Sequence, residues 1–355
     1  MRKSLASLAV MLGCVAGAPD VPPSVPIVPA GDPVPQEPDQ AVAEAEAEAP
    51  IAFPYVEVAM VPPAEPVADP EPDSEPDPGP ATPIVIAEGD SVIPQTMLHL
   101  SVHPLIVAKL APKAWKWTAK QPHLSQSVFL PGPGYASPTF TANVAGEYAF
   151  SVEVEGPDGV VTTLPSQLVM VLPGDAIHVE LLWHTPLDED ETDEGPETGS
   201  DMDLHFIHDA YAPSGPDLDK DGQPDGWFDQ PFDCFWFNAH PNWGSFDPSK
   251  DDNPNLDRDD TDGAGPENLN MAIPENTVYR IGVHYWSDHE YGPSEATVRI
   301  YIYGFLKFEE TCVLVNHDLW NVATISWPST KVTPTADEVC STITPTYQNP
   351  FFFQP

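Results

Sequence analysis

The sequence predicts an all-β protein, in which two β-sandwich domains follow a disordered linker rich in proline and acidic residues. Three observations support this class. Apolar residues recur at every second position in several segments beyond about residue 92, which is the period of a strand. No stretch has the period of an amphipathic helix, because proline, glycine and β-branched residues interrupt each run. The 46 prolines are densest before residue 91, where no strand pattern is visible.

The first residues are typical of an export signal. Two positive charges near the start are followed by an apolar run at 5–12 that is too short to span a bilayer. The run ends in Met-Leu-Gly-Cys14, which resembles the bacterial lipobox, whose cysteine carries the lipid. The resemblance implies that residues 1–14 are a lipoprotein signal peptide and that Cys14 anchors an exported protein at the outer membrane or cell surface. Cleavage near 16–18, which would release a soluble protein, is the alternative.

Residues 15–90 are expected to form a disordered stalk. Alanine alternates with glutamate over 43–49, and proline alternates with acidic residues over 71–78. No Lys or Arg lies between Lys3 and Lys109. Like charges and a preference for the polyproline II conformation would keep such a chain extended, so that it lifts the folded part off the membrane.

The charge of the chain excludes one class of partner. Its 355 residues carry a formal net charge of −42, with only 13 Lys and Arg. Such a surface repels phosphate backbones and anionic head groups, so nucleic acid is excluded as a partner. Contact with a membrane is therefore expected through the N-terminal lipid anchor.

Residues 91–174 are predicted to form the first sandwich. Residues 147–154 alternate, with apolar side chains at the even positions. A Pro-Asp-Gly turn at 157–159 leads into a returning strand. Trp115 and Trp117 share one strand face and would fill the core.

A set of spaced residues in this segment carries a resemblance: Gly146, Tyr148, Phe150, Val152, Val154, Asp158 and Gly159. With the preceding Trp strand, they resemble PKD-type, immunoglobulin-like modules. The resemblance implies a seven-strand sandwich with a tyrosine corner at Tyr148, and it implies no catalytic activity.

Residues 175–310 are predicted to form a second sandwich. Apolar residues alternate over five segments, at 177–183, 201–208, 232–238, 278–286 and 297–305. Residues 311–355 are predicted to be a C-terminal β extension, with a strand at 319–327 and a Phe triplet at 351–353 docked on the domain.

The cysteines that follow Cys14 are Cys234, Cys312 and Cys340. An exported protein can oxidise its thiols, so one disulfide and one free cysteine are expected. The sequence leaves the three pairings open, although a bond between Cys312 and Cys340 would tie the last hairpin together. The spacings contain no CxxC, so a zinc site of three cysteines is not expected.

Acidic residues of the second sandwich form two groups that we interpret as metal ligands. In the first group, odd positions of the strand 201–208 point away from the core, which sets two carboxylates about 7 Å apart. Loops with Asp-Gly and Gly-Pro turns supply further oxygen ligands, which suit Ca²⁺. A solvated acidic face is the alternative. The ligands of this group are Asp201, Asp203, Asp257, Asp259, Asp260, Asp262 and Glu267, with His205 beside them.

The second group lies at 217–225 and has the spacing of a Ca²⁺ loop. Aspartates occupy positions one, three, five and nine of this segment. A glycine directly follows the third aspartate, as in EF-hand and thrombospondin type-3 segments. The chain departs from that pattern at position twelve, where Phe228 replaces the acid. An acidic turn without a ligand is the alternative. The expected ligands are Asp217, Asp219, Asp221, Asp225 and the carbonyl of Gln223, with Gly222 at the turn.

Eight short motifs of the region 177–305 carry a second resemblance: Val179-Glu-Leu-Leu-Trp183, Ser200-Asp-Met-Asp-Leu-His205, Asp233-Cys-Phe-Trp-Phe-Asn238, Asn242-Trp-Gly244, Asp252-Asn-Pro254, Leu256-Asp-Arg-Asp-Asp260, Gly265-Pro-Glu267 and Tyr279-Arg-Ile-Gly-Val-His-Tyr-Trp286. The region resembles the YfaP-like family of bacterial domains of unknown function and, more distantly, jelly-roll pre-peptidase C-terminal domains. The resemblance implies a β-sandwich accessory domain on an exported protein, with a metal site that joins two loops.

The sequence predicts a binding protein, not an enzyme. It contains no nucleophile elbow, P-loop, dinucleotide fingerprint or HExxH motif. His205 and His208 face opposite sides of a strand, so a metal shared between them is not expected. Trp227, Trp243 and Trp286 are candidates for stacking on a sugar, with core placement as the alternative for each.

The predicted function is that of a non-catalytic cell-surface lipoprotein. Its Ca²⁺-stabilised β-sandwich would act as an adhesion or ligand-binding module for an extracellular glycan or protein. A structural protein of the cell envelope without a specific ligand is one alternative. The accessory domain of a metal-dependent hydrolase is the other.

Overall fold

A computed structural model gives the fold of the chain. It describes residues 82–192, 195, 198–211, 217, 222, 225–229, 231–245, 247, 249–261, 263–335, 340 and 342–343. The predicted signal peptide with Cys14, the predicted stalk up to residue 81 and the Phe triplet at 351–353 lie outside the described residues. The described residues form twenty strands, one α-helix and two 3₁₀ helices, so the all-β prediction is confirmed. Within this part of the chain, no helix is both long and apolar enough to cross a membrane.

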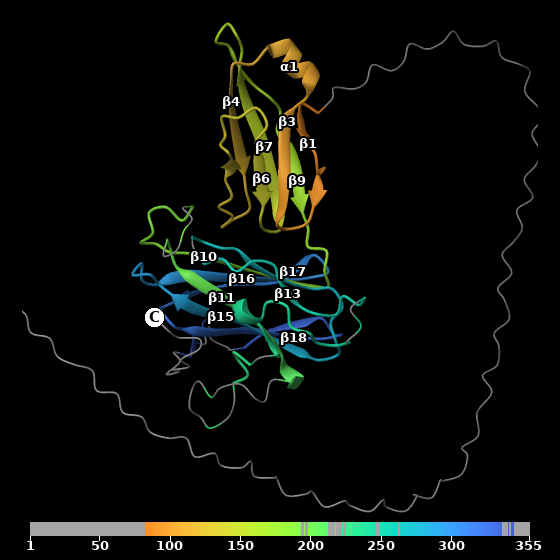
Figure 1. The fold of residues 1–355 in the computed structure, drawn as a ribbon, viewed down its shortest axis with the longest axis vertical. Coiled ribbons are helices and arrows are strands. Elements are labelled where there is room, and N and C mark those ends of the chain that lie inside the picture. Colours follow the sequence, from red (N-terminus) through yellow and green to blue (C-terminus); the bar gives the residue numbers. More distant parts are fainter. Residues whose placement is uncertain are drawn as a thin grey trace, which may run out of the picture. The chain divides into compact units, whose positions relative to one another are not determined.

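The first sandwich contains strands β1 (Ile84–Ile86), β2 (Ser91–Val92), β3 (Thr96–Val102), β4 (Ala114–Lys120), β5 (Phe129–Leu130), β6 (Thr139–Ala142), β7 (Gly146–Glu155), β8 (Val161–Thr163) and β9 (Gln167–Val171). One sheet has the strand order β1-β3-β6-β5, and the other has β2-β9-β7-β4, with β8 beside β7 (Figure 1). Trp117, Phe140 and Phe150 pack into one core with apolar residues of both sheets.

The boundary and the strand number of this sandwich differ from the predictions. Strand β1 begins at Ile84, whose side chain is fully buried, so the sandwich starts before the predicted residue 91. The described residues form nine strands instead of the seven implied by the resemblance, because β2 and β5 are short additional strands of two residues each. Three residues of alternation after a proline-rich run are too few to be recognised as a strand in the sequence.

A short helix, α1 (Pro104–Leu110), was not predicted. Pro104 occupies its first turn, where the missing N–H of proline costs nothing. The ring of His103 accepts the Leu105 N–H at 3.3 Å, and Ala111 ends the helix in the left-handed conformation. Seven residues make about two turns, which is too few for a helical period to be visible among strands.

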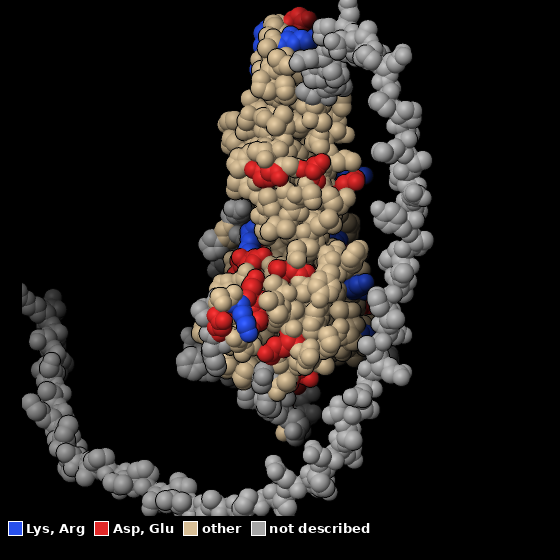
Figure 2. All heavy atoms as spheres, turned by 90° about the vertical axis from the view of Figure 1, so that its right-hand side faces the viewer, with Lys and Arg blue, Asp and Glu red and all other residues tan. Residues whose placement is uncertain are grey.

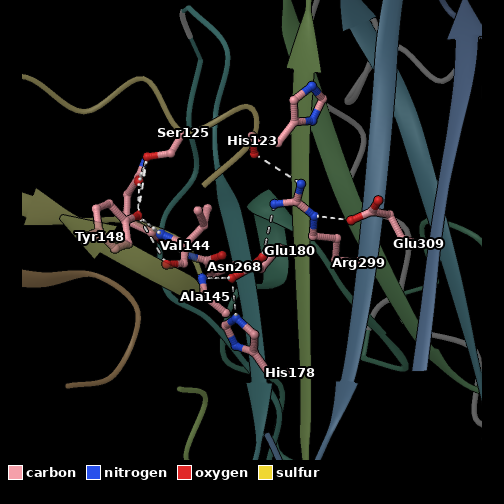
Figure 3. Close-up of polar contacts among 11 residues, drawn as sticks. His123, Ser125, Val144, Ala145, Tyr148, His178, Glu180, Asn268, Arg299 and Glu309 are labelled. Atoms are coloured by element: carbon pink, nitrogen blue, oxygen red, sulfur yellow. Dashed lines mark hydrogen bonds and ion pairs between the residues drawn. The ribbon is translucent and has the colours of Figure 1, made fainter. Parts of the chain in front are cut away.

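The tyrosine corner expected from the PKD-type resemblance is present at Tyr148 (Figure 3). The buried Tyr148 hydroxyl donates to the Asn143 side chain at 3.0 Å, and it accepts the Val144 N–H at 3.2 Å. These bonds fix the turn that precedes β7. Burial raises the pKa of Tyr148 to about 12.

The second sandwich contains β10 (Ile177–His184), β11 (Asp201–His208), a 3₁₀ turn (Asp209–Tyr211), β12 (Asp233–Cys234), a second 3₁₀ turn (Trp236–Asn238), β13 (Asn255–Leu256), β14 (Glu267–Met271), β15 (Val278–Ser287), β16 (Ser294–Ile302), β17 (Phe305–Leu314), β18 (Leu319–Ser326), β19 (Lys331–Pro334) and β20 (Thr342–Ile343). One sheet has the order β13-β14-β10-β16-β17, and the other has β12-β11-β15-β18-β19, with β20 beside β18 (Figure 1). A single apolar core lies between the two sheets.

Two predicted strands of this domain have different bounds. The segment 232–238 forms strand only at Asp233–Cys234, and a 3₁₀ turn follows it. The segment 297–305 contains a hairpin: β16 ends at Ile302, and Tyr303 and Gly304 form a two-residue turn with positive φ angles of 50° and 76°. Alternating apolar residues on both sides of such a short turn imitate one continuous strand.

Residues 311–335 belong to the second sandwich and are not a separate extension, which corrects the predicted boundary at 310. Strand β17 runs across that boundary, and β18 lies between β15 and β19 in its sheet. The predicted strand at 319–327 is confirmed as β18, and Trp320 is part of the core. Of the three open cysteine pairings, the structure has Cys312 bonded to Cys340, and Cys234 is free and buried.

A buried carboxylate joins the second sandwich to the turn before β7 (Figure 3). Glu180 on β10 is fully buried and accepts the Ala145 N–H at 2.6 Å. The ring of His178 contacts the same oxygen at 3.2 Å. Arg299 on β16 approaches Glu180 within 3.9 Å and donates to the His123 carbonyl at 3.1 Å. These contacts give Oε1 of Glu180 two partners, and Arg299 Nη1 is the charged group near Oε2, which has no hydrogen-bond partner among the described residues.

Candidate metal centre

Strand β11 is buried on both of its faces. Met202, Leu204 and Phe206 point into the core between the sheets, as predicted. The opposite face carries Asp203 and His205, whose exposures are 2% and 0%. The alternative of a solvated acidic face is therefore wrong for these two residues.

Three aromatic side chains cover that opposite face: Trp227, Phe228 and Phe235, which we call the aromatic cover. Phe235 stacks on the His205 ring with centroids 5.0 Å apart, and Phe228 meets the same ring edge-on at 4.6 Å. Gly282 on β15 leaves space for Trp227, because a Cβ atom at position 282 would lie 2.7 Å from the indole. The polar groups beneath the cover therefore lie in a medium of low dielectric constant, where charges interact strongly.

Asp203, Asp259 and Glu267 form the acidic cluster, in which one carboxylate oxygen of each residue lies within 4.8 Å of the others. Asp203 and Glu267 are buried, and Asp259 is exposed. Glu267 is the first residue of β14, and its Oε2 accepts the Leu204 N–H of β11 at 2.6 Å. Its Oε1 accepts the Asp260 N–H at 3.3 Å. The carboxylate of Glu267 thus links both sheets and the loop that follows β13.

Burial and mutual repulsion raise the pKa values of the buried carboxylates. Burial, followed by the charges of Asp201, Asp259 and Asp233, holds the pKa of Asp203 well above its usual value. Burial, followed by the charge of Asp203, raises the pKa of Glu267 well above its usual value. No Lys or Arg among the described residues forms an ion pair with a member of the acidic cluster. Protonation or a bound cation would relieve the repulsion within the cluster.

The structure brings together part of the first predicted ligand group. Asp203, Asp259 and Glu267 meet, and the largely buried Asp201 adds its charge to theirs. Asp260 lies beside the cluster, but its Oδ1 pairs with Arg258 Nη2 at 3.0 Å. Asp262 lies outside the described residues.

Asp257 is not a member of the acidic cluster, so its assignment to this group is wrong. Its N–H donates to the Asn268 carbonyl at 2.8 Å, which continues the pairing of β13 with β14. Its side chain stays at that sheet edge, where Oδ1 accepts from the Asn255 amide at 2.6 Å and Oδ2 accepts from the Asn270 amide. The side chains of Asp257 and Asp259 therefore have different surroundings, although the two residues are only two positions apart in the chain.

Asp203, His205 and His284 form the histidine cluster, which sequence reasoning missed. One ligand atom of each lies within 4.8 Å of the others, and all three residues are buried. His205 follows Asp203 by two positions on β11, and His284 lies directly opposite Asp203 on β15. His284 Nδ1 is 3.4 Å from Asp203 Oδ2. Burial, followed by the charges of His205 and His317, holds the pKa of His284 well below its usual value, which favours the neutral imidazole.

Most of the second predicted ligand group lies outside the described residues. This holds for Asp219, Asp221 and Gln223. The predicted turn is present: Gly222 has a φ of 90°, and its N–H donates to Asp217 Oδ2 at 3.0 Å. Asp217 is exposed, and Asp225 is partly buried. Ca²⁺ binding by this loop stays a prediction.

Two of the three tryptophans considered for sugar stacking are buried, which corrects that assignment. Trp227 is 1% exposed within the aromatic cover, and Trp243 is 4% exposed within the main core. Neither offers a ring face to a ligand. Trp286 is partly buried and packs against Trp236, with ring centroids 5.5 Å apart.

The face of the molecule in Figure 2 shows several separate groups of Asp and Glu side chains, with scattered Lys and Arg between them. This distribution agrees with a chain that has 55 Asp and Glu against 13 Lys and Arg. Such a surface attracts cations and repels anionic partners.

The chain matches none of the family models and none of the curated proteins with which it was compared. Its class is therefore defined by its fold and by these clusters. It is an all-β protein in which the second sandwich carries a candidate metal centre.

Proposed function

We propose that this protein is an exported, lipid-anchored cell-surface protein, whose second sandwich binds Ca²⁺ and serves as a non-catalytic adhesion or ligand-binding module. The observation that carries the proposal is the acidic cluster, in which three carboxylates lie within 4.8 Å of one another. A bound cation relieves the repulsion within such a group when its carboxylates are ionised. The partner would be an extracellular glycan or protein.

Ca²⁺ fits the acidic cluster better than other common metal ions. All three ligands are carboxylate oxygens, and Ca²⁺ takes six to eight oxygen ligands in flexible geometry. Asp259 is exposed, so solvent reaches the cluster from one side and can supply water ligands. Mg²⁺ demands stricter octahedral geometry at shorter distances, which a cluster of two strand residues and one exposed loop residue is less able to meet.

Three features support a location outside the cytoplasm. The N-terminal residues have the pattern of an export signal with a lipobox-like cysteine at Cys14. Cys312 and Cys340 form a disulfide, which persists in oxidising compartments. Extracellular Ca²⁺ modules bind with dissociation constants of about 10⁻⁴ to 10⁻³ M, so a site with few protein ligands is filled outside the cell.

The first test is calorimetric titration of Ca²⁺ into the EDTA-stripped chain, with a melting curve alongside. We expect saturable binding and a higher melting temperature in Ca²⁺. Asp259→Asn should weaken the binding, and Asp257→Asn, whose side chain lies at the β13–β14 edge, serves as the matched control. Absence of binding at millimolar Ca²⁺ would refute the metal part of the proposal.

The second test concerns the anchor and the partner. Cys14→Ala should move the protein from the membrane fraction to the soluble fraction, and an unchanged distribution would refute lipidation. Binding to a glycan array or to immobilised surface proteins should disappear in EDTA. Ca²⁺-dependent stability without any bound partner would favour a structural envelope role, and turnover of polysaccharide or peptide substrates would favour a hydrolase.

A further inference from the structure

The ring of His205 has an unusual environment for a buried histidine. Its Nδ1 lies 2.7 Å from Asp233 Oδ2, and both side chains are fully buried. Its Nε2 is also buried and has no hydrogen-bond partner among the described residues. A buried polar atom without a partner is energetically costly, which favours a bound group at this position.

The contact with Asp233 fixes which nitrogen of His205 is available. The Asp233 carboxylate also accepts the Phe228 N–H at 2.7 Å, so it is held in place by the backbone of the aromatic cover. A carboxylate accepts the proton of Nδ1–H, which leaves the lone pair on Nε2. Metal-bound histidines commonly have this arrangement, with one nitrogen on the metal and the other donating to a carboxylate.

His205 belongs to a group of three buried side chains whose donor atoms suit a metal ion. One ligand atom each of Asp203, His205 and His284 lies within 4.8 Å of the others. Bonds of about 2.1 Å to a tetrahedral ion set ligand atoms about 3.4 Å apart. The ligand atoms therefore have to approach one another by at most about 1.4 Å per pair to surround such an ion.

We propose that His205, His284 and Asp203 form a second metal site, which binds a transition-metal dication such as Zn²⁺, and that Asp233 positions His205. Two imidazole nitrogens and one carboxylate suit Zn²⁺ and its neighbours, whereas Ca²⁺ and Mg²⁺ prefer oxygen ligands. The site does not depend on the Ca²⁺ binding proposed above, although Asp203 belongs to both clusters. The metal would tie β11 to β15 beneath the aromatic cover.

The experiment is titration of Zn²⁺ and of Co²⁺ into the metal-stripped full chain, by calorimetry and by visible absorption. We expect one Zn²⁺ per chain at this site and the visible bands of tetrahedral Co²⁺. His205→Gln and His284→Gln should each weaken Zn²⁺ binding at least 100-fold. Asp233→Asn keeps all three ligands, and it should weaken binding by roughly 10- to 100-fold, as loss of a positioning carboxylate does.

Two control variants show whether the metal binds at this site. His208→Gln changes a buried histidine on the other face of β11, which contacts Glu275 at 2.9 Å, and it should leave Zn²⁺ binding unchanged. Asp259→Asn should weaken Ca²⁺ binding but not Zn²⁺ binding. The experiment therefore distinguishes failure of the Ca²⁺ proposal from failure of the Zn²⁺ proposal. Near-ultraviolet circular dichroism would verify that each variant is folded.

Three results would overturn the proposal. The first is the absence of saturable Zn²⁺ binding by the folded wild-type chain. The second is equal Zn²⁺ affinity in wild type and in folded His205→Gln. The third is an intense thiolate-to-Co²⁺ charge-transfer band, which would assign the metal to the free thiol of Cys234.

Discussion

Replacing Asp259 with asparagine should have opposite effects on stability with and without Ca²⁺. The side chain is exposed, so the substitution changes little packing. Its carboxylate lies within 4.8 Å of Asp203 and Glu267. At an effective dielectric constant of about 20, two unit charges at that distance repel by about 3.5 kcal/mol. Solvent screening of Asp259 and protonation of the buried partners reduce this repulsion energy. We therefore expect the metal-free variant to gain about 1 kcal/mol of stability.

In Ca²⁺ the same substitution should reduce stability. At a concentration 100 times the dissociation constant, a bound ion stabilises the wild type by about 2.7 kcal/mol. If the lost ligand weakens binding 100-fold, the gain at that concentration falls to about 0.4 kcal/mol. The free energy of unfolding of the variant is therefore higher than that of the wild type in EDTA and lower in Ca²⁺.

The assay is urea unfolding of both proteins in EDTA and in Ca²⁺ at one pH, followed by tryptophan fluorescence. Asp257→Asn is the matched control, because it removes one negative charge at a neighbouring position that lies outside the acidic cluster. An equal loss of stability for Asp259→Asn in both media would refute the reasoning, since it would mean that the residue has a structural role unrelated to a cation.

Three further predictions concern stability. Because burial raises the pKa of Tyr148 to about 12, the folded state keeps this proton after the unfolded chain has lost it, so stability falls as pH rises from about 10 to about 12. Tyr148 contributes a slope of unfolding free energy against pH that approaches about 1.4 kcal/mol per pH unit. The Tyr148→Phe variant should lose this contribution when urea unfolding is measured at a series of alkaline pH values. An unchanged slope would contradict the raised pKa. Gly282→Ala should destabilise the fold by about 1 to 3 kcal/mol, because the new methyl group meets Trp227, and a neutral effect in thermal melts would show that the indole can move. Replacing both Cys312 and Cys340 with serine should cost about 3.5 kcal/mol, from a closed loop of 28 residues, measured as a lower urea midpoint than that of the oxidised wild type; coinciding midpoints would argue against the bond.

The sequence by itself determined the fold class and the positions of most long strands. The alternation over 147–154 and 201–208 is visible because one side chain in two faces a core, and each segment is strand in the structure. Boundaries were less accurate, because β1 has three residues and a two-residue turn at Tyr303 hides the end of β16. Local patterns of that length carry too little information to be distinguished from chance.

Only the tertiary structure decided which of the polar residues meet. Strand parity placed Asp203 and His205 on one face, but it could not show that the aromatic cover buries that face. Asp257 and Asp259 are equivalent in the sequence, and the pairing of β13 with β14 separates them. His284 is 81 residues from Asp203 in the chain, and the register of β11 with β15 sets the two side by side. The local sequence determines which side chains share a face of one strand. Contacts between strands depend on their register, which the fold as a whole determines.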